Sequence, residues 1–225
     1  MGKTILTPKQ LKFLELAAVE PKIVKDFYLT GGTALSEFYL HHRLSEDLDL
    51  FCPTDEVDQK FVGLFLKKIS QKMKIKYLRP TVFLGLVSYK LVFADGKELK
   101  VDFNYYPFLQ IDKGVMFDNL KVDSIYDIAT NKLHTLFMKP RARDYVDLYF
   151  ILQQENYSLE RLIVDAKIKF DWHIDNITLA SQFTRAKDLS LTDLPRMLVP
   201  FNQKTMEKFF LDQAKSLKNQ IFSKK

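Results

Sequence analysis

The feature of this 225-residue sequence that most constrains its fold is a change in hydrophobic periodicity near Val122. Before that residue, short runs alternate apolar and polar residues, which is the period of a β-strand, and helix-like stretches separate them. After it, each long run repeats its apolar residues at helical spacing. The sequence therefore predicts an α+β fold, with a mixed-sheet nucleus over residues 1–122 that includes an N-terminal helix. An α-helical subdomain over residues 123–225 is expected to complete a cleft.

Local signals place the elements of the first half. Thr7 and Pro8 suit the N-cap and the first turn of an opening helix. A short strand-like run ends at Gly31, and the stretch after it has helical spacing. Further along, Asp95-Gly96 separates the runs "TVFLGLVSYKLVFA" and "KELKVDFNYY". An Asp-Gly pair between two strand-like runs predicts a β-hairpin with these runs as its arms.

Three aspartates have the spacing of a metal site. In the alternating run "EDLDLF", Asp47 and Asp49 are two residues apart, so both side chains are expected to leave one face of a strand. Asp102 lies on the polar face of the second hairpin arm. Carboxylates placed so closely repel each other unless a cation lies among them. Because Mg²⁺ prefers carboxylate and phosphate oxygens, we expect the three aspartates to hold two Mg²⁺ ions.

A glycine turn precedes the first two aspartates. Gly31 and Gly32 stand between a strand and a helix N-terminus, where amide groups and the helix dipole attract phosphate. Thr33 can cap the helix or contact a phosphate, and Arg43 and Ser45 can contact a triphosphate or the carboxylates. A Gly-Gly pair alone is more often only a turn, and an isolated Asp-x-Asp is usually a surface feature. The order of strand, Gly-Gly turn, helix, Asp-x-Asp strand and Asp strand along the chain is a more specific signal than the Gly-Gly pair or the Asp-x-Asp pair alone.

The stretch Gly31-Gly32-Thr33-Ala34-Leu35, followed by "RLSEDLD", resembles the first motif of the nucleotidyltransferase fold shared with DNA polymerase β. More narrowly, it resembles the AbiEii/AbiGii toxin branch, in which a Gly-Gly or Gly-Ser turn and a helix precede Arg-x-Ser-x-Asp-x-Asp. The third acidic residue of that family follows on a strand, as in "KVDF" here. The resemblance covers most of residues 27–152.

The resemblance also assigns roles in the second half. Lys132 falls inside the apolar stripe of its expected helix, where a lysine either extends to water or meets an anion. The family carries a lysine on this helix that contacts the nucleotide phosphates. Asp144 and Asp147 share a helix face in "RDYVDLYFIL", which resembles the Arg-Asp-x-x-Asp motif of the family. This implies that both aspartates lie at the nucleotide or acceptor cleft and that Arg141 or Arg143 contacts phosphate, although Asp144 equally suits a helix cap.

The composition indicates the cellular compartment of the protein and the kind of molecule that it binds. One cysteine, Cys52, excludes an internal disulfide, and no apolar run reaches membrane-spanning length, so the sequence predicts a cytoplasmic protein. A net charge of +6 favours a nucleotide or nucleic acid as partner. His41-His42, at the end of a helix, is expected at the surface. Several lysines on the expected last helix either are simply solvated or follow an RNA backbone: Lys204, Lys208, Lys215 and Lys218, then Lys224-Lys225.

Together these features predict an enzyme that moves a nucleoside monophosphate from a nucleoside triphosphate (NTP) to an acceptor hydroxyl. Asp47 and Asp49 would bind the metals, Asp102 would assist the nucleophile, and Gly31, Gly32, Ser45 and Lys132 would hold the triphosphate. The resemblance implies RNA, in particular a tRNA end, as the acceptor, and a toxin paired with an antitoxin protein. Two alternatives stay open: a protein hydroxyl as the acceptor, and a nucleotide- or partner-binding module without turnover.

Overall fold

The structure is a computed structural model that describes residues 4–173 and 175–222, with side chains described as far as residue 217. The chain forms two compact units. Unit 1 comprises Met1–Tyr39 and Ser45–Ser124, and unit 2 comprises Leu40–Leu44 and Ile125–Lys225. The chain therefore enters unit 2 for one short segment before it returns to complete the sheet of unit 1.

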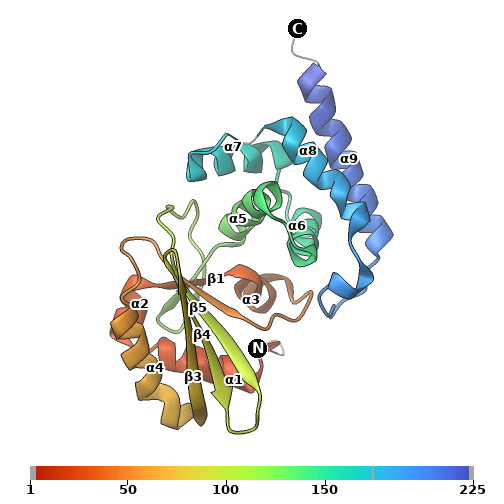
Figure 1. The fold of residues 1–225 in the computed structure, drawn as a ribbon. Coiled ribbons are helices and arrows are strands. Elements are labelled where there is room, and N and C mark those ends of the chain that lie inside the picture. The colour runs from red at the N-terminus through yellow and green to blue at the C-terminus, as the bar shows by residue number, and fades with distance from the viewer. Residues whose placement is uncertain (1–3, 174, 223–225) are drawn as a thin grey trace. The chain divides into compact units, whose positions relative to one another are not determined.

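Unit 1 is built on a seven-stranded mixed sheet in the order β3-β4-β5-β2-β1-β7-β6 (Figure 1). β2 pairs with β5, and β1 with β7, in parallel, and the remaining pairs are antiparallel. The strands are β1 (Tyr28–Thr30), β2 (Leu48–Cys52), β3 (Ile75–Phe83), β4 (Leu86–Phe93), β5 (Glu98–Tyr105), β6 (Met116–Phe117) and β7 (Leu120–Val122). With the helices that flank it, this sheet confirms the predicted α+β class.

The helices of unit 1 flank the sheet on both sides. In Figure 1, α2 and α4 lie on one side of the sheet and α3 on the other. Phe13 of α1 packs edge-on against Phe65 of α4, and Phe27, just after α2, packs against Phe103 of the sheet. These helices are α1 (Pro8–Ala17), α2 (Pro21–Asp26), α3 (Gly31–Leu35), which continues as a π-helical turn (Ser36–Leu40), and α4 (Gln59–Met73).

The register of the sheet sets an apolar row beside a polar one. The residues of the apolar row are buried, and they are successive partners across β4, β5, β2 and β1: Val87, Phe103, Leu50 and Leu29. One position along the strands, the successive partners are polar: Ser88, Asp102, Asp49 and Thr30. Because neighbouring residues of a strand point to opposite faces, the polar row projects from the face opposite to the apolar row.

Several sequence predictions for unit 1 hold. The side chain of Thr7 accepts a hydrogen bond from the amide of Gln10 and caps α1, with Pro8 in the first turn. β4 and β5 form a hairpin that turns at Asp95-Gly96, where Gly96 has a φ of +77°. The alternation in "EDLDLF" corresponds to β2, whose residues alternate between buried and half-buried.

Other details differ from the prediction. The run expected as the first hairpin arm contains two strands, β3 and β4, which are joined at Leu84 and Gly85 with φ values of 39° and 80°. A leucine rarely adopts a positive φ, so the sequence gives little warning of a turn there. β2 begins at Leu48, which leaves Asp47 just outside the strand. β6 and β7, of two and three residues, are too short for a periodic pattern.

Unit 2 is helical, as the periodicity beyond Val122 predicts. Its α-helices are α5 (Ile125–Met138), α6 (Ala142–Gln154), α7 (Leu159–Phe170), α8 (Asn176–Thr184) and α9 (Gln203–Phe222). Two 3-10 turns, Arg185–Asp188 and Leu191–Asp193, lie between α8 and α9. Leu40–Leu44 joins unit 2 through backbone hydrogen bonds from Leu44 to Arg196 and from Leu198 to His42, at 2.9 Å each.

Candidate functional site

The polar row of unit 1 brings two of the three predicted metal ligands together. Asp49 of β2 and Asp102 of β5 are direct partners in the parallel register. Strands in a sheet lie about 5 Å apart, so the two carboxylates leave the same face as neighbours. Asp49 is half-buried and Asp102 is buried. The sequence separates them by a helix and a hairpin, and only the pairing of β2 with β5 makes them adjacent.

Both carboxylate oxygens of Asp102 have partners. The hydroxyl of Ser88, its register neighbour on β4, donates to Oδ1 at 2.5 Å. The ammonium group of Lys100, two residues earlier on the same face of β5, contacts Oδ2. A lysine therefore supplies the positive charge that close carboxylates require.

The glycine turn lies directly against Asp49. Gly31 begins α3 with a φ of +75°, and a Cβ at this position would lie 2.3 Å from Oδ2 of Asp49. Thus both the backbone conformation and the contact exclude a larger residue. Gly32 follows in the first turn of α3 and is half-buried, while the Thr33 hydroxyl donates to the backbone carbonyl of Asp47.

Asp47 and Ser45 lie on the segment that enters β2. Asp47 is half-buried and precedes the strand, so the expectation that it shares a strand face with Asp49 is not met by the backbone. The backbone carbonyl of Ser45 accepts a hydrogen bond from the side-chain amide of Gln10 at 2.8 Å. Within residues 4–173 and 175–217, no three or more His, Cys, Asp or Glu side chains are grouped so that they could hold a metal ion.

A further carboxylate, which the sequence did not single out, extends the polar row. Asp123 directly follows β7 and is fully buried. Its carboxylate accepts hydrogen bonds from the hydroxyl of Thr30 and the amide of Gln110, both at 2.7 Å. Thr30 is in turn the register partner of Asp49. Because β7 has only three residues, no alternating pattern marked Asp123 in the sequence.

In unit 2, four of the predicted site residues form one buried cluster: Arg43, Lys132 and Asp147, predicted to bind the nucleotide, and Asp144, predicted to be catalytic. The guanidinium of Arg43 donates to both oxygens of Asp147, at 2.6 and 2.8 Å. Lys132 contacts Asp147 and Asp144 at 2.7 Å each. Asp144 also accepts a hydrogen bond from the backbone amide of Arg141 at 3.0 Å, which confirms its capping role at the start of α6. Two carboxylates thus balance two cations.

The histidine that precedes Arg43 belongs to this cluster. Nε2 of His42 lies 2.9 Å from Asp147, and its side chain is fully buried, so the prediction of a surface pair is wrong for His42. His41, with a φ of +49°, is exposed as expected. The reversal of the backbone at His41 turns His42 inward. A pair of polar residues after an apolar helix carries no sequence signal for such a turn.

Burial and charge set the ionisation of the cluster. Burial opposes ionisation of Asp147, but Lys132 and Arg43 outweigh it and hold the pKa of this carboxyl well below its usual value. Burial would lower the pKa of Lys132, yet Asp147 and Asp144 raise it overall. For His42 burial prevails over Asp147, and its pKa is lowered. The Nε2–H group of a neutral His42 therefore donates a hydrogen bond to the Asp147 carboxylate.

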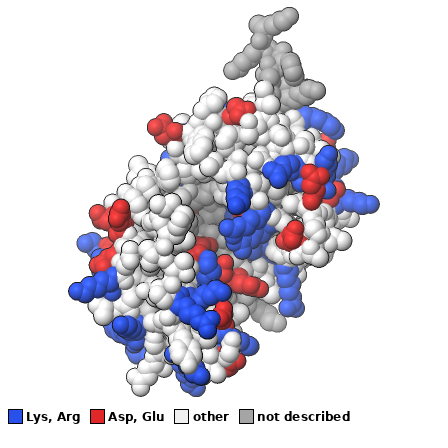
Figure 2. All heavy atoms as spheres, viewed as in Figure 1, with Lys and Arg blue, Asp and Glu red and all other residues white. Residues whose placement is uncertain are grey.

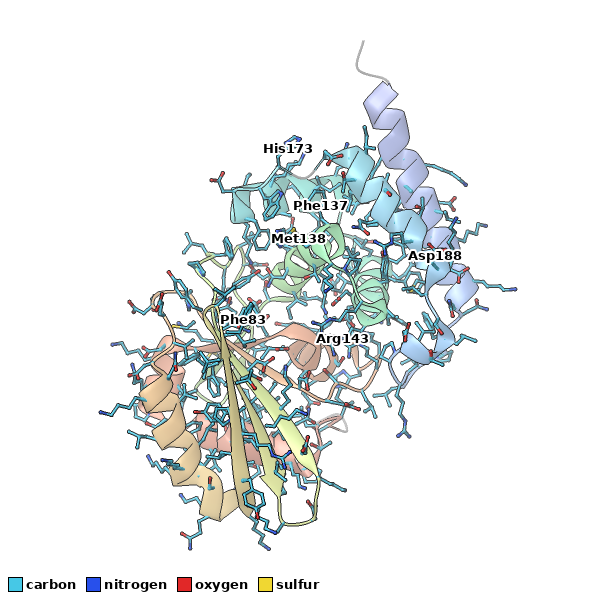
Figure 3. The ribbon with its side chains drawn as sticks, in the orientation of Figure 1. Phe83, Phe137, Met138, Arg143, His173 and Asp188 are labelled. Atoms are coloured by element: carbon cyan, nitrogen blue, oxygen red, sulfur yellow. The ribbon has the colours of Figure 1, made fainter. Side chains whose placement is uncertain are left out.

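The roles assigned to this cluster from the family resemblance stay predictions. Lys132 meets two carboxylates of its own unit instead of extending to water, and Arg43 is 2% exposed. Arg143, labelled in Figure 3, lies in the first turn of α6 and is half-buried.

Positive charge is distributed over the surface. On the face drawn in Figure 2, lysine and arginine side chains form several groups interspersed with acidic side chains. On the last helix, Lys204, Lys208 and Lys215 are exposed, and Lys215 pairs with Asp212 at 3.0 Å. The side chain of Lys218, as well as Lys224 and Lys225, lies outside the described residues. Across the described part of the chain, no helix combines the length and apolar character needed to cross a membrane.

Solved structures share the fold of the protein. A putative nucleotidyltransferase from Helicobacter pylori superposes with a TM-score of 0.58 at 19% identity, over 96% of this chain and 97% of that one. JHP933 from Helicobacter pylori superposes with a TM-score of 0.57 at 18% identity, over 96% and 94% of the two chains. The mixed sheet with its polar row is thus a nucleotidyltransferase fold.

Sequence comparison assigns the family. The profile described as "Nucleotidyl transferase AbiEii toxin, Type IV TA system" matches residues 13–218, so the chain belongs to this family of nucleotidyltransferases, the toxins of type IV toxin–antitoxin systems. The predicted family is therefore confirmed. An uncharacterised protein of Aquifex aeolicus is 28% identical over 149 residues, which are 66% of this chain and 68% of that protein.

Proposed function

We propose that this protein transfers a nucleoside monophosphate from an NTP to a hydroxyl of RNA, in particular a tRNA end, in a Mg²⁺-dependent reaction in the cytoplasm. The reaction site is the polar row of unit 1. The observation that supports this most directly is the register pairing of Asp49 with Asp102, with Gly31 packed against Asp49. The toxin family to which the chain belongs adds a cognate antitoxin as its partner.

The side chains of the polar row fit magnesium. Asp49 and Asp102 are neighbouring carboxylates that offer hard oxygen ligands, so they would hold Mg²⁺ together with phosphate oxygens of the substrate. Asp47, one residue before β2, is the third ligand in this proposal, and two ions are expected. Bound Mg²⁺ supplies positive charge to the triphosphate and lowers the pKa of the acceptor hydroxyl.

The residues of the chain orient the reactants and move a proton. The acceptor oxygen bonds to the α-phosphorus, the bond to pyrophosphate breaks, and the carboxylate of Asp102 accepts the hydroxyl proton. The hydrogen bond from Ser88 to Oδ1 fixes the rotation of this carboxylate. Gly31 packs against Asp49 at the start of α3, and the backbone amides of the Gly31-Gly32 turn are the proposed donors to the phosphates. Catalysis then rests on positioning and charge neutralisation.

A transfer assay tests this function. The protein is incubated with each of the four labelled NTPs, Mg²⁺ and either purified tRNA or total protein. We expect label in tRNA from the wild type, and Asp49→Asn to reduce it by about 100-fold or more because a metal ligand is lost. Asp55→Asn, an exposed aspartate in the loop after β2, is the matched control and should keep full activity.

The outcomes separate the acceptors. Label in protein instead of tRNA would replace the RNA acceptor with a protein hydroxyl. Full transfer by Asp49→Asn, or equal transfer with Mg²⁺ chelated, would contradict the role of the polar row.

A further inference from the structure

We propose that Lys100 is a built-in counter-ion of the polar row, whose ammonium group must leave Asp102 when a divalent cation binds. Lys100 thereby sets the metal affinity of the site. This inference rests on the proposed function, because it concerns the same carboxylates. It assigns a competitive role to Lys100, the first residue of "KVDF", to which the sequence patterns gave no role.

The position of Lys100 follows from the strand. Lys100 and Asp102 are two residues apart on β5, so both side chains leave the face that carries Asp49. The β2–β5 register begins with Leu48 opposite Val101, so Lys100 lies one residue before the first paired position of β5. The ammonium group therefore lies on the face that carries Asp49 and Asp102.

The contact of Lys100 uses the oxygen that a metal would need. The hydroxyl of Ser88 donates a hydrogen bond to Oδ1 of Asp102, and the ammonium group of Lys100 contacts Oδ2. A cation that binds through Asp102 must share Oδ2 with a positive charge or displace it. A divalent ion and an ammonium group repel each other strongly at contact distance, so displacement is favoured.

The side chain of Lys100 is able to leave. It is 37% exposed, whereas that of Asp102 is 10% exposed, so the lysine reaches solvent while the carboxylate is largely covered. Its four-carbon stem is flexible, and its ammonium is readily hydrated. Hence the lysine neutralises Asp102 before the metal arrives and then rotates outward, while the carboxylate remains held by Ser88.

The other lysine at this level of the sheet has a different partner. Lys90 on β4 is the register partner of Lys100 and projects from the same face. It pairs with Glu98 at 3.5 Å. Lys90 therefore provides a matched control, because its replacement removes the same charge at one strand's distance without freeing Asp102.

The test is direct titration of the full-length protein with Mn²⁺ in the absence of nucleotide, followed by calorimetry or by the electron paramagnetic resonance of free Mn²⁺. An exposed ion pair typically shifts such an equilibrium two- to fivefold, so Lys100→Met should bind Mn²⁺ about two- to fivefold more tightly. Lys90→Met should change the affinity much less. Lys100→Arg keeps the charge and should bind no more tightly than the wild type.

Several outcomes would overturn the inference. Unchanged or weaker Mn²⁺ binding by Lys100→Met, with the fold intact by circular dichroism, contradicts it. Equal tightening by Lys90→Met would show only a general charge effect. If Lys100→Met fails to fold, Lys100→Gln is titrated instead. Binding is measured without turnover, so absent nucleotidyl transfer would defeat the proposed function alone, while absent tightening would defeat this inference alone.

Discussion

At the scale of single residues, Gly31 couples the backbone to the site. A Cβ there would overlap the Asp49 carboxylate at 2.3 Å, and its φ of +75° disfavours any other residue. Gly96 has nearly the same φ, +77°, but a Cβ there would meet no atom within 4 Å. The two glycines therefore separate the effect of backbone strain from the effect of the contact.

Gly31→Ala should reduce transfer by about 100-fold, because displacement of a ligand by even 1 Å can cost that much. Gly96→Ala should keep its activity, although both variants should lose about 1–2 kcal/mol of stability from the left-handed backbone. Transfer assays and urea denaturation measure the two quantities. Similar activity in both variants would mean that the contact with Asp49 does not matter.

His42 should make the stability of the protein depend on pH, because its pKa differs between the folded and the unfolded chain. Its pKa is lowered because burial outweighs the attraction of Asp147, while Arg43 and Lys132 also oppose its protonation. The unfolded chain then binds a proton that the folded chain does not, so stability falls as the pH drops below about 6.5. His134, whose pKa burial also lowers, contributes to the same window.

His42→Gln should reduce the pH dependence of the unfolding free energy between pH 6.5 and 5. One proton corresponds to a slope of at most about 1.4 kcal/mol per pH unit. The contribution of His134 to this slope remains in the variant. Glutamine retains a donor for Asp147. The control is His41→Gln, at an exposed site, which should leave the slope as in the wild type. Urea denaturation at several pH values measures it, and an unaltered slope in His42→Gln would be evidence against a neutral buried histidine.

At the scale of elements, Asp147 joins α6 to α5 and to the segment Leu40–Leu44. One carboxylate on α6 binds Lys132 of α5 and both Arg43 and His42 of that segment. Leu40–Leu44 comes before β2 in the chain, and the contacts of Asp147 fix this segment within unit 2.

Asp147→Asn should destabilise the protein at pH 7 by about 3–5 kcal/mol, since it leaves buried cations without their partner. Glu98→Gln removes a carboxylate from exposed pairs with Arg79 and Lys90 and should cost less than about 1 kcal/mol. Denaturant titrations of the three proteins provide the comparison. Equal effects of the two substitutions would argue against the buried cluster.

The same variant has a predicted pH signature. A depressed pKa stabilises the folded state above the unfolded value, near 3.9, and this contribution is lost as the pH falls through the folded value. The difference between wild type and Asp147→Asn should therefore shrink below about pH 4. A constant difference down to pH 2 would indicate that charge is not its origin.

At the scale of the whole molecule, the periodic patterns carried most of the information. Alternation predicted β2 and the β4–β5 hairpin, and helical spacing predicted α5 to α9, because these elements bury one face and their sequences must repeat with the element. The patterns missed β6 and β7, which are too short to repeat, and joined β3 to β4, because Leu84 occupies a turn position that leucine seldom takes.

The residues of the candidate site also fall into those that a local pattern marks and those that only the folded chain brings together. The sequence by itself determined which residues are candidates for the chemistry: the glycine turn, Asp47, Asp49 and Asp102, and the motif of α6, since these depend on residue type and spacing along one element. Only the tertiary structure decided that Asp49 faces Asp102, that Lys100 neutralises Asp102, that Asp123 extends the row, and that His42 is buried against Asp147. Strand pairing and burial join residues that are far apart in the chain, and a single local pattern contains no information about such partners.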